Sequence, residues 1–189
     1  MLDDIAKTEF VGYTDMKATA KVTAIVKDGA RVEAVETGDD IVFTLDRTSF
    51  YAESGGQVGD TGVITNDSCT IRVLDTTKNA AGVFIHKAVV EEGFLREGDT
   101  VEAVVDVERR RAIMRNHTAA HLLQAALRSV LGDHVEQAGQ LVNENAVRFD
   151  FTHFSALTDE ELLAVENLVN EKILSLIHIS EPTRLLSIS

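Results

Sequence analysis

The sequence is poor in several residue types, and each shortage narrows what the chain can be. A single cysteine, Cys69, excludes an internal disulfide and suits a reducing compartment. The single proline, Pro182, lies close to the end of the sequence. No apolar run reaches the ~20 residues that a membrane-spanning helix needs, and the acidic start lacks the features of a secretory signal. We therefore expect a cytoplasmic protein with no membrane partner.

Basic residues are scarce as well. The 18 Lys and Arg residues are outnumbered by 31 Asp and Glu residues, which gives a formal net charge of −13. Because proteins hold nucleic-acid phosphates with Lys and Arg, this balance argues against a general binder of DNA or RNA. The one dense basic stretch, residues 108–115, fits a solvated helix face as well as an RNA-facing patch. Any contact with RNA must therefore be local.

Hydropathy patterning predicts an α+β fold in two parts. Over residues 20–106, short segments rich in Val, Ile, Thr and Phe are separated by Gly- and Asp-containing turns, which indicates a small antiparallel β-barrel. An α+β domain follows over residues 107–174. The strands expected in the barrel are residues 21–26, 31–35, 41–45, 70–74, 83–90 and 101–107.

The second part changes to a helical period. Ile113, Ala120, Leu127 and Leu131 fall on one row of a long helix expected over 108–131. A hairpin is expected next, from residues 135–142 and 147–152. A final helix should begin at a capping box formed by Thr158 and Glu161, with Leu162, Val165, Val169 and Ile173 facing inward.

The two ends of the sequence differ from the rest. Residues 1–19 are interpreted as the end of a preceding linker or domain, because Leu2 to Ile5 resembles the middle of a longer chain. Residues 175–189 break the helical pattern and resemble a translated cloning adapter. We exclude this non-native tail from functional reasoning.

A histidine pair is the first candidate for chemistry. His117 and His121 stand one turn apart on the long helix, so both imidazoles can reach one metal ion. Thr118 stands where a zinc protease has its glutamate base, which excludes a peptidase of that type. A zinc site needs three or four protein ligands, and this pattern supplies two. The alternative is a pair of partly buried structural histidines.

A glycine-dense loop is the second candidate. Residues 48–62 read TSFYAESGGQVGDTG, with four glycines within eight residues. Such a backbone can turn sharply and present N–H groups to an anion or an ester carbonyl. It matches neither the P-loop nor the dinucleotide-binding pattern. From the residues alone, a strained β-turn is the favoured interpretation.

These stretches together resemble one family. The loop at 48–62, the segment RNHTAAHLL at 115–123, VEQAGQLV at 135–142 and VRFDFTH at 147–153 match alanyl-tRNA synthetases and their free-standing editing relatives in order and spacing. The resemblance extends over residues 8–173, nearly all of the native part.

The resemblance implies roles for particular residues. It implies that His117 and His121 are zinc ligands and that the other two ligands belong to a downstream Cys-x-x-x-His motif, so the zinc site would be incomplete here. Where the family commonly has a threonine before the second histidine, this sequence has Ala120. The implied catalytic residues are Gln57 and Gln137, and the implied substrate-binding residues are Gly55, Gly56, Arg115 and Thr118.

The implied activity is hydrolysis of the ester that joins serine or glycine to alanine tRNA. Gln57 and Gln137 should then approach the histidine pair from two sides of one cleft. ATP would be used only by an aminoacylation domain that is absent here, as is the family's oligomerisation domain. The segment alone should bind zinc weakly and edit poorly. Two alternatives are a free-standing trans-editing deacylase and a noncatalytic module that positions tRNA.

Overall fold

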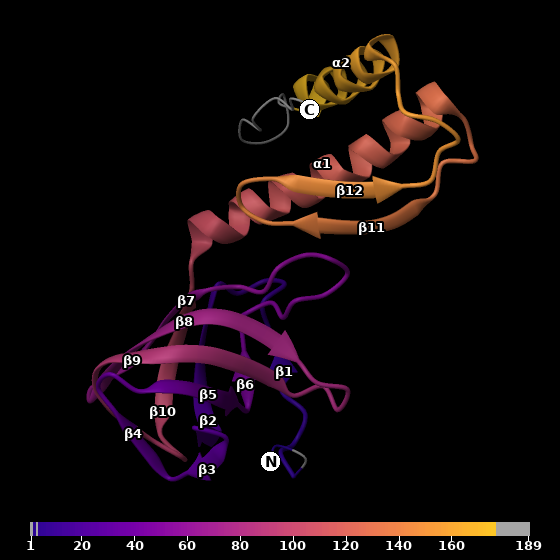
Figure 1. Cartoon of the computed structure of the whole chain (residues 1–189). Helices are drawn as coiled ribbons and strands as arrows, with labels where there is room; N and C mark the ends of the chain where they lie inside the picture. Colours follow the sequence, from indigo (N-terminus) through magenta and orange to yellow (C-terminus); the bar gives the residue numbers. More distant parts are fainter. Residues whose placement is uncertain (1, 3, 177–189) are drawn as a thin grey trace. The chain divides into compact units, whose positions relative to one another are not determined.

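The structure is a computed structural model that describes residue 2 and residues 4–176. It has the expected α+β composition, with a β-rich unit and a mixed unit (Figure 1). The first compact unit consists of Met1–Ser54 and Val58–Arg110. The second consists of Gly55–Gln57 and Arg111–Ser189. Three loop residues, 55–57, thus belong to the unit that contains most of the long helix.

The first unit is a closed antiparallel β-barrel. Six strands follow one another in the order β10, β7, β8, β9, β5 and β2, and β10 pairs back onto β2 to close the barrel. The short strands β3 and β4 pair with β2 and β9, and β1 pairs in parallel with β6. The bounds are β1 Glu9–Phe10, β2 Lys17–Lys27, β3 Ala30–Val32, β4 Ala34–Glu36, β5 Asp40–Leu45, β6 Arg47–Thr48, β7 Gly62–Asn66, β8 Cys69–Lys78, β9 Phe84–Arg96 and β10 Thr100–Val105.

Alternating hydropathy explains the barrel. In β2, residues from Lys17 to Val22 alternate between exposed and buried, as a strand with one face in a core requires. The interior is filled by fully buried side chains that include Phe43, Leu45 and Ile71. Each such side chain contributes about 1.5–3 kcal/mol relative to exposure.

The strand predictions are confirmed in position, with differences in bounds and number. Strand β2 begins earlier than predicted, β8 ends later, β10 ends at Val105 before the predicted end, and the short strands β1 and β6 were not predicted. The stretch expected at 31–35 forms two short strands, β3 and β4, which pair with different neighbours. Strand β9 continues beyond residue 90 to Arg96. Strand β7 was not predicted, although it connects β10 to β8 and is needed to close the barrel.

The second unit contains helix α1 (Val107–Leu131, which starts in the first unit), strands β11 (Gln137–Val142) and β12 (Val147–Phe151), and helix α2 (Asp159–Leu176). The hairpin lies along α1 in Figure 1. Phe149 and Phe151 of β12 pack against a buried cluster of Leu127, Val165 and other side chains from both helices. The predicted helix, hairpin and second helix are confirmed.

The capping box that starts α2 is also confirmed. The Glu161 N–H donates to Thr158 Oγ1 at 3.2 Å, and the Thr158 N–H donates to Glu161 Oε2 at 2.8 Å. Helix α2 continues to Leu176, past the start of the predicted adapter segment. The rest of that segment, with Pro182, lies outside the described residues. No helix in the described part of the chain is long and apolar enough to cross a membrane.

Candidate active site

The glycine-dense loop forms a tight turn at Gly55 and Gly56. Their φ angles are +59° and +82°. Two successive residues with positive φ are the requirement of a type I′ turn, which glycine meets without steric cost. A Cβ on Gly56 would lie 2.3 Å from the Gln140 carbonyl oxygen, so no side chain fits there. The turn predicted from the residues alone is present.

Strand β11 holds this turn by donating hydrogen bonds to the carbonyl groups of the two glycines. Gln140 Nε2 donates to the Gly55 carbonyl at 2.6 Å, and the Val142 N–H donates to the Gly56 carbonyl at 2.8 Å. Gln57 also forms an isolated parallel bridge with Val142. Three residues of the loop are thereby fixed on the edge of the hairpin.

The base of the loop is closed within the barrel unit. The Asp60 N–H donates to the Tyr51 carbonyl at 2.9 Å, and the Tyr51 N–H donates to Asp60 Oδ2 at 2.7 Å. Asp60 also forms a buried ion pair with Arg110, whose guanidinium further donates to the carbonyls of Gly12 at 3.0 Å and Ser49 at 2.7 Å. Both charged side chains are buried. Arg110 is therefore neither a solvated face nor an RNA-facing residue.

Gln57 and His117 meet although 60 positions separate them in the sequence. His117 Nδ1 donates to Gln57 Oε1 at 2.7 Å, with Gln57 buried. This bond orients the imidazole and places the lone pair on Nε2, which is how a metal-binding histidine is commonly held. The His121 ring lies 5.0 Å from the His117 ring between centroids. Gln57 therefore contacts the histidine pair, whereas the predicted approach of Gln137 from the other side of a shared cleft stays a prediction.

The electrostatics favour a neutral His117. Partial burial lowers its pKa, and positive charge on His121 lowers it further. A neutral imidazole is the form that coordinates a metal or accepts a proton. The described residues contain no group of three or more His, Cys, Asp and Glu side chains arranged to hold a metal ion.

Other predicted site residues have more open surroundings. Gln137 is exposed, and among the described residues its side chain has no hydrogen-bond partner. Thr118 is exposed and donates its hydroxyl to the Met114 carbonyl at 3.1 Å, within its own helix. Arg115 is half-buried on α1. The roles assigned to these three residues stay predictions.

Sequence reasoning missed two residues that build this site. Gln140 donates to the Gly55 carbonyl, and it lies in the same segment, residues 135–142, from which Gln137 was predicted as a site residue. Asn116 Nδ2 donates to the Asn143 carbonyl at 2.7 Å, which ties the hairpin turn to α1 directly before His117. A polar residue adjacent to the first histidine was the available signal for Asn116.

Comparison with known proteins identifies the family. A family model described as class II tRNA synthetases (A) matches residues 1–109, more than half of the chain. The chain belongs to the class II tRNA synthetase family. It is 54% identical over 173 residues to an alanine–tRNA ligase of Acetivibrio thermocellus, covering 92% of this chain and 20% of that protein.

Further relatives are also alanine–tRNA ligases. Identity is 51% over 184 residues to an alanine–tRNA ligase of Thermoanaerobacter sp. strain X514, covering 96% of this chain and 21% of that protein. Identity is 46% over 171 residues to an alanine–tRNA ligase of Bacillus velezensis, covering 90% of this chain and 20% of that protein. The chain thus spans about a fifth of the length of these relatives.

Proposed function

We propose that this chain forms part of a site that hydrolyses mischarged alanine tRNA, cleaving the ester between serine or glycine and the terminal adenosine. Its support is the contact of Gln57 with His117, which joins a glycine turn to a helical histidine pair. Membership of a tRNA synthetase family supports tRNA as the partner. In this proposal, ATP-dependent attachment of alanine takes place elsewhere in a longer cytoplasmic protein.

The need for such a site follows from the sizes of the amino acids. A pocket shaped for alanine cannot sterically exclude glycine, and one methylene contributes only about 1–3 kcal/mol of discrimination. A second, hydrolytic site removes the errors. An aminoacyl ester is already activated, so the site must position water and stabilise the developing negative charge on the carbonyl oxygen.

The residues on α1 suit half of a zinc site. His117 presents Nε2 because its Nδ1–H is held by Gln57, and His121 lies one turn away on the same side of the helix. Zinc at this pair would supply a Lewis acid, which either polarises the ester carbonyl or holds the substrate. The described residues supply two ligands in suitable spacing, so the proposal takes the others from outside them.

The remaining predicted residues act around this pair. The turn at Gly55 and Gly56 lies against Gln140 of β11, where no side chain fits on Gly56, and Gln57, the next residue, keeps His117 in one tautomer. Gln137 is proposed to position water or the ester, with Arg115 and Thr118 as substrate contacts. Each of these steps is performed by side chains or backbone of this chain.

The test uses a protein that contains this chain together with the family's downstream Cys-x-x-x-His segment. Hydrolysis of seryl-tRNA for alanine is measured for the native sequence, Gln57→Leu and Gln57→Glu. Leucine removes the acceptor for His117 Nδ1–H, whereas glutamate keeps one. We expect about a 10- to 100-fold loss for leucine, the usual effect of removing such an orienting group, and partial recovery for glutamate.

Two results would contradict the proposal. Equal hydrolysis by all three proteins would show that the contact between Gln57 and His117 has no part in the reaction. Absence of hydrolysis in the native protein, with tRNA binding retained, would favour the noncatalytic tRNA-positioning module. Zinc content is measured in parallel, because comparable zinc binding and hydrolysis by the 189-residue chain alone would exclude ligands outside it.

A further inference from the structure

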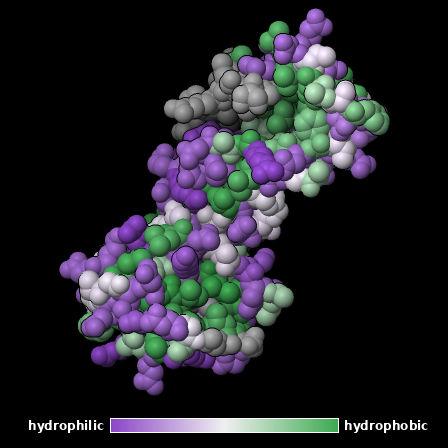
Figure 2. All heavy atoms as spheres, in the orientation of Figure 1, coloured by the Kyte–Doolittle hydropathy of each residue, from purple (hydrophilic) through white to green (hydrophobic). Residues whose placement is uncertain are grey.

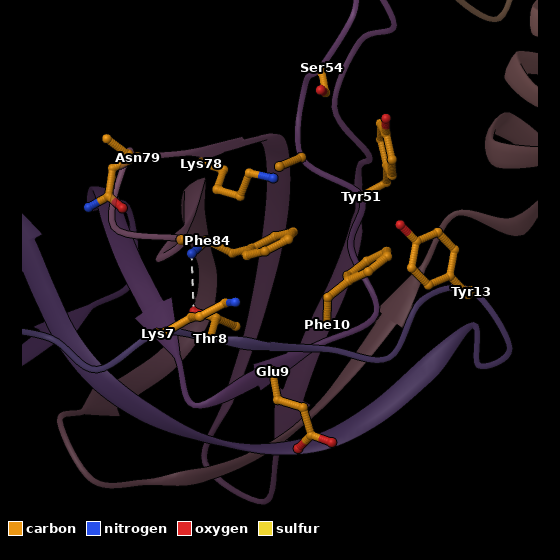
Figure 3. A pocket seen from close by; sticks show the side chains of 13 residues that line it. Lys7, Thr8, Glu9, Phe10, Tyr13, Tyr51, Ser54, Lys78, Asn79 and Phe84 are labelled. Carbon is orange, nitrogen blue, oxygen red and sulfur yellow. Dashed lines mark hydrogen bonds between the residues drawn. The ribbon is translucent and has the colours of Figure 1, made fainter.

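A concave site lies wholly within the barrel unit (Figure 3). It is a pocket of about 640 Å³, within the ~300–1,000 Å³ range of sites for small ligands. Neither histidine of the candidate active site lines it. The pocket is built from β1 and the residues around it, the start of the glycine-dense loop, and the turn that joins β8 to β9. The candidate active site does not use these side chains.

Four aromatic rings form the floor and one side of this pocket. Phe10 and Phe84 are stacked, with centroids 5.3 Å apart and planes 8° apart. Tyr13 meets Phe10 edge-on at 4.9 Å, and Tyr51 lies 6.2 Å from Phe10. Figure 3 shows the Tyr13 and Tyr51 rings standing at the side of the Phe10 ring. The arrangement offers flat apolar surface at several orientations.

The exposure of this cluster sets it apart from the barrel core. Tyr13 is 85% exposed, and Phe10 and Tyr51 are half-buried. Figure 2 shows hydrophobic atoms gathered on the barrel unit near the place where Figure 1 labels β1 and β6, with hydrophilic atoms around them. An exposed aromatic contributes little to the core, because its surface stays in water. A cluster of aromatic rings that reaches the surface, as this one does at Tyr13, is typical of a binding surface.

The charges around the rings are mainly positive. Lys78 Nζ lies 5.6 Å from the centroid of the Phe84 ring, and the Lys7 side chain runs beside Gly82. Among the described residues neither lysine belongs to an ion pair. Glu9 also lines the pocket, but it lies 3.7 Å from Arg47 Nε, and its carboxylate points away from the rings in Figure 3. In a chain of net charge −13, two lysines beside aromatic rings form a local exception.

We propose that this pocket binds one unpaired nucleotide of an RNA strand, with its base against Tyr13 and Tyr51 and its phosphate at Lys7 and Lys78. Stacking on aromatic rings combined with cationic phosphate contacts is how proteins bind single-stranded nucleic acid. The RNA partner rests on the proposed function, since tRNA carries an unpaired 3′ end. The acidic charge of the rest of the chain excludes broad contact with a duplex.

The chain provides its own optical probe for this pocket. It contains no tryptophan and two tyrosines, Tyr13 and Tyr51, and both line the pocket. The 189-residue chain is titrated with a single-stranded RNA hexamer that ends in CCA, and intrinsic tyrosine fluorescence is recorded. Stacking of a base should quench this emission. Anisotropy of the same hexamer labelled with fluorescein gives the dissociation constant independently.

Substitutions test the two parts of the contact separately. Tyr13→Ala should weaken hexamer binding by about 5- to 150-fold, the range for loss of one stacked base, whereas Tyr13→Phe should stay within about threefold. Neutralisation of one phosphate predicts a slope of about −0.7 for the logarithm of affinity against the logarithm of salt concentration. A double variant, Lys7→Gln combined with Lys78→Gln, should bring this slope close to zero. Lys21→Gln, an exposed lysine on β2 outside the pocket, is the matched control.

Several outcomes would overturn the proposal. Binding of AMP as tight as that of the hexamer would make the pocket a mononucleotide site, and equal binding of a blunt RNA duplex would exclude recognition of an unpaired base. Unchanged hexamer binding by Tyr13→Ala would exclude stacking of a base on Tyr13. The hexamer carries no ester, so its binding is measured independently of hydrolysis. Hexamer binding without hydrolysis would therefore refute the proposed function alone, and hydrolysis without hexamer binding would refute this inference alone.

Discussion

Replacing Arg110 by methionine should destabilise the barrel unit severely. The guanidinium of Arg110 donates to Asp60, Gly12 and Ser49, and both members of the ion pair are buried. Methionine fills a similar volume but leaves the Asp60 carboxylate buried without its positively charged partner, although the Tyr51 N–H still donates to its side chain. Loss of one partner of a buried ion pair typically costs about 3–5 kcal/mol. That loss is a large part of the ~5–15 kcal/mol that stabilises a whole domain.

The assay follows from the composition. Both tyrosines, Tyr13 and Tyr51, lie in the barrel unit, so urea unfolding monitored by tyrosine fluorescence reports on that unit. Arg109→Met is the matched control, because Arg109 is half-buried and donates to the Gly59 carbonyl at 2.8 Å. The control should lose only about 0.5–1.5 kcal/mol for that bond. Equal losses for Arg109→Met and Arg110→Met would refute the argument from burial.

A double substitution separates charge burial from packing. Asp60→Leu combined with Arg110→Met removes both charges, and replacement of a buried ion pair by apolar residues is often neutral. The double variant should therefore be more stable than either single variant. If the two losses simply add, the ion pair is not the source of the effect, and our account of the loop base is wrong.

Three further predictions concern single positions. Gly56→Ala should lower the free energy of unfolding of the second unit by at least ~1 kcal/mol, because the φ of Gly56 is +82° and an added Cβ would meet the Gln140 carbonyl. Urea unfolding followed by circular dichroism measures this loss, and Ala138→Gly is the control. Burial lowers the pKa of His86 from 6.5 to about 4, so the unfolded chain binds more protons below pH 6.5. The barrel should lose stability as the pH falls from about 6.5 towards 4, and a His86→Leu variant should show a smaller loss in the same fluorescence assay. Thr158→Ala should cost about 1 kcal/mol of helix stability by circular dichroism, and an unchanged midpoint would show that the capping box contributes nothing.

The local parts of the fold were predictable from the sequence. Helix α1, the hairpin and the capping box at Thr158 depend on periodicity and on contacts between near neighbours, which a linear pattern displays. Strand β7 (Gly62–Asn66) was missed because it directly follows the glycine-dense loop and is only partly buried. Closure of the barrel depends on pairing between β10 and β2, about 80 residues apart, which no local signal encodes.

The burial of Arg110 could have been predicted from its position in the helical period. Arg110 precedes Ile113 by three positions and His117 by seven, so it shares their face of α1. By charge alone, the arginines of residues 108–115 form one basic run. Helical periodicity separates them, because only the arginine on the apolar row faces the core and needs a buried partner.

The bulge in β11 decides which glutamines share a face, and it could not be predicted. In a regular strand, Gln137 and Gln140 would point to opposite faces, because their separation is odd. The register shifts between Gln137 and Gly139, so that Gln137 lies opposite Phe151 and Gln140 opposite Phe149. Directly opposed side chains share a face, and Phe149 and Phe151 are two residues apart on the face that packs against the helices. The pairing thus sets both glutamines opposite phenylalanines of that face, with Gln140 half-buried against the glycine turn and Gln137 exposed, and Gln137 stays a candidate for the reaction.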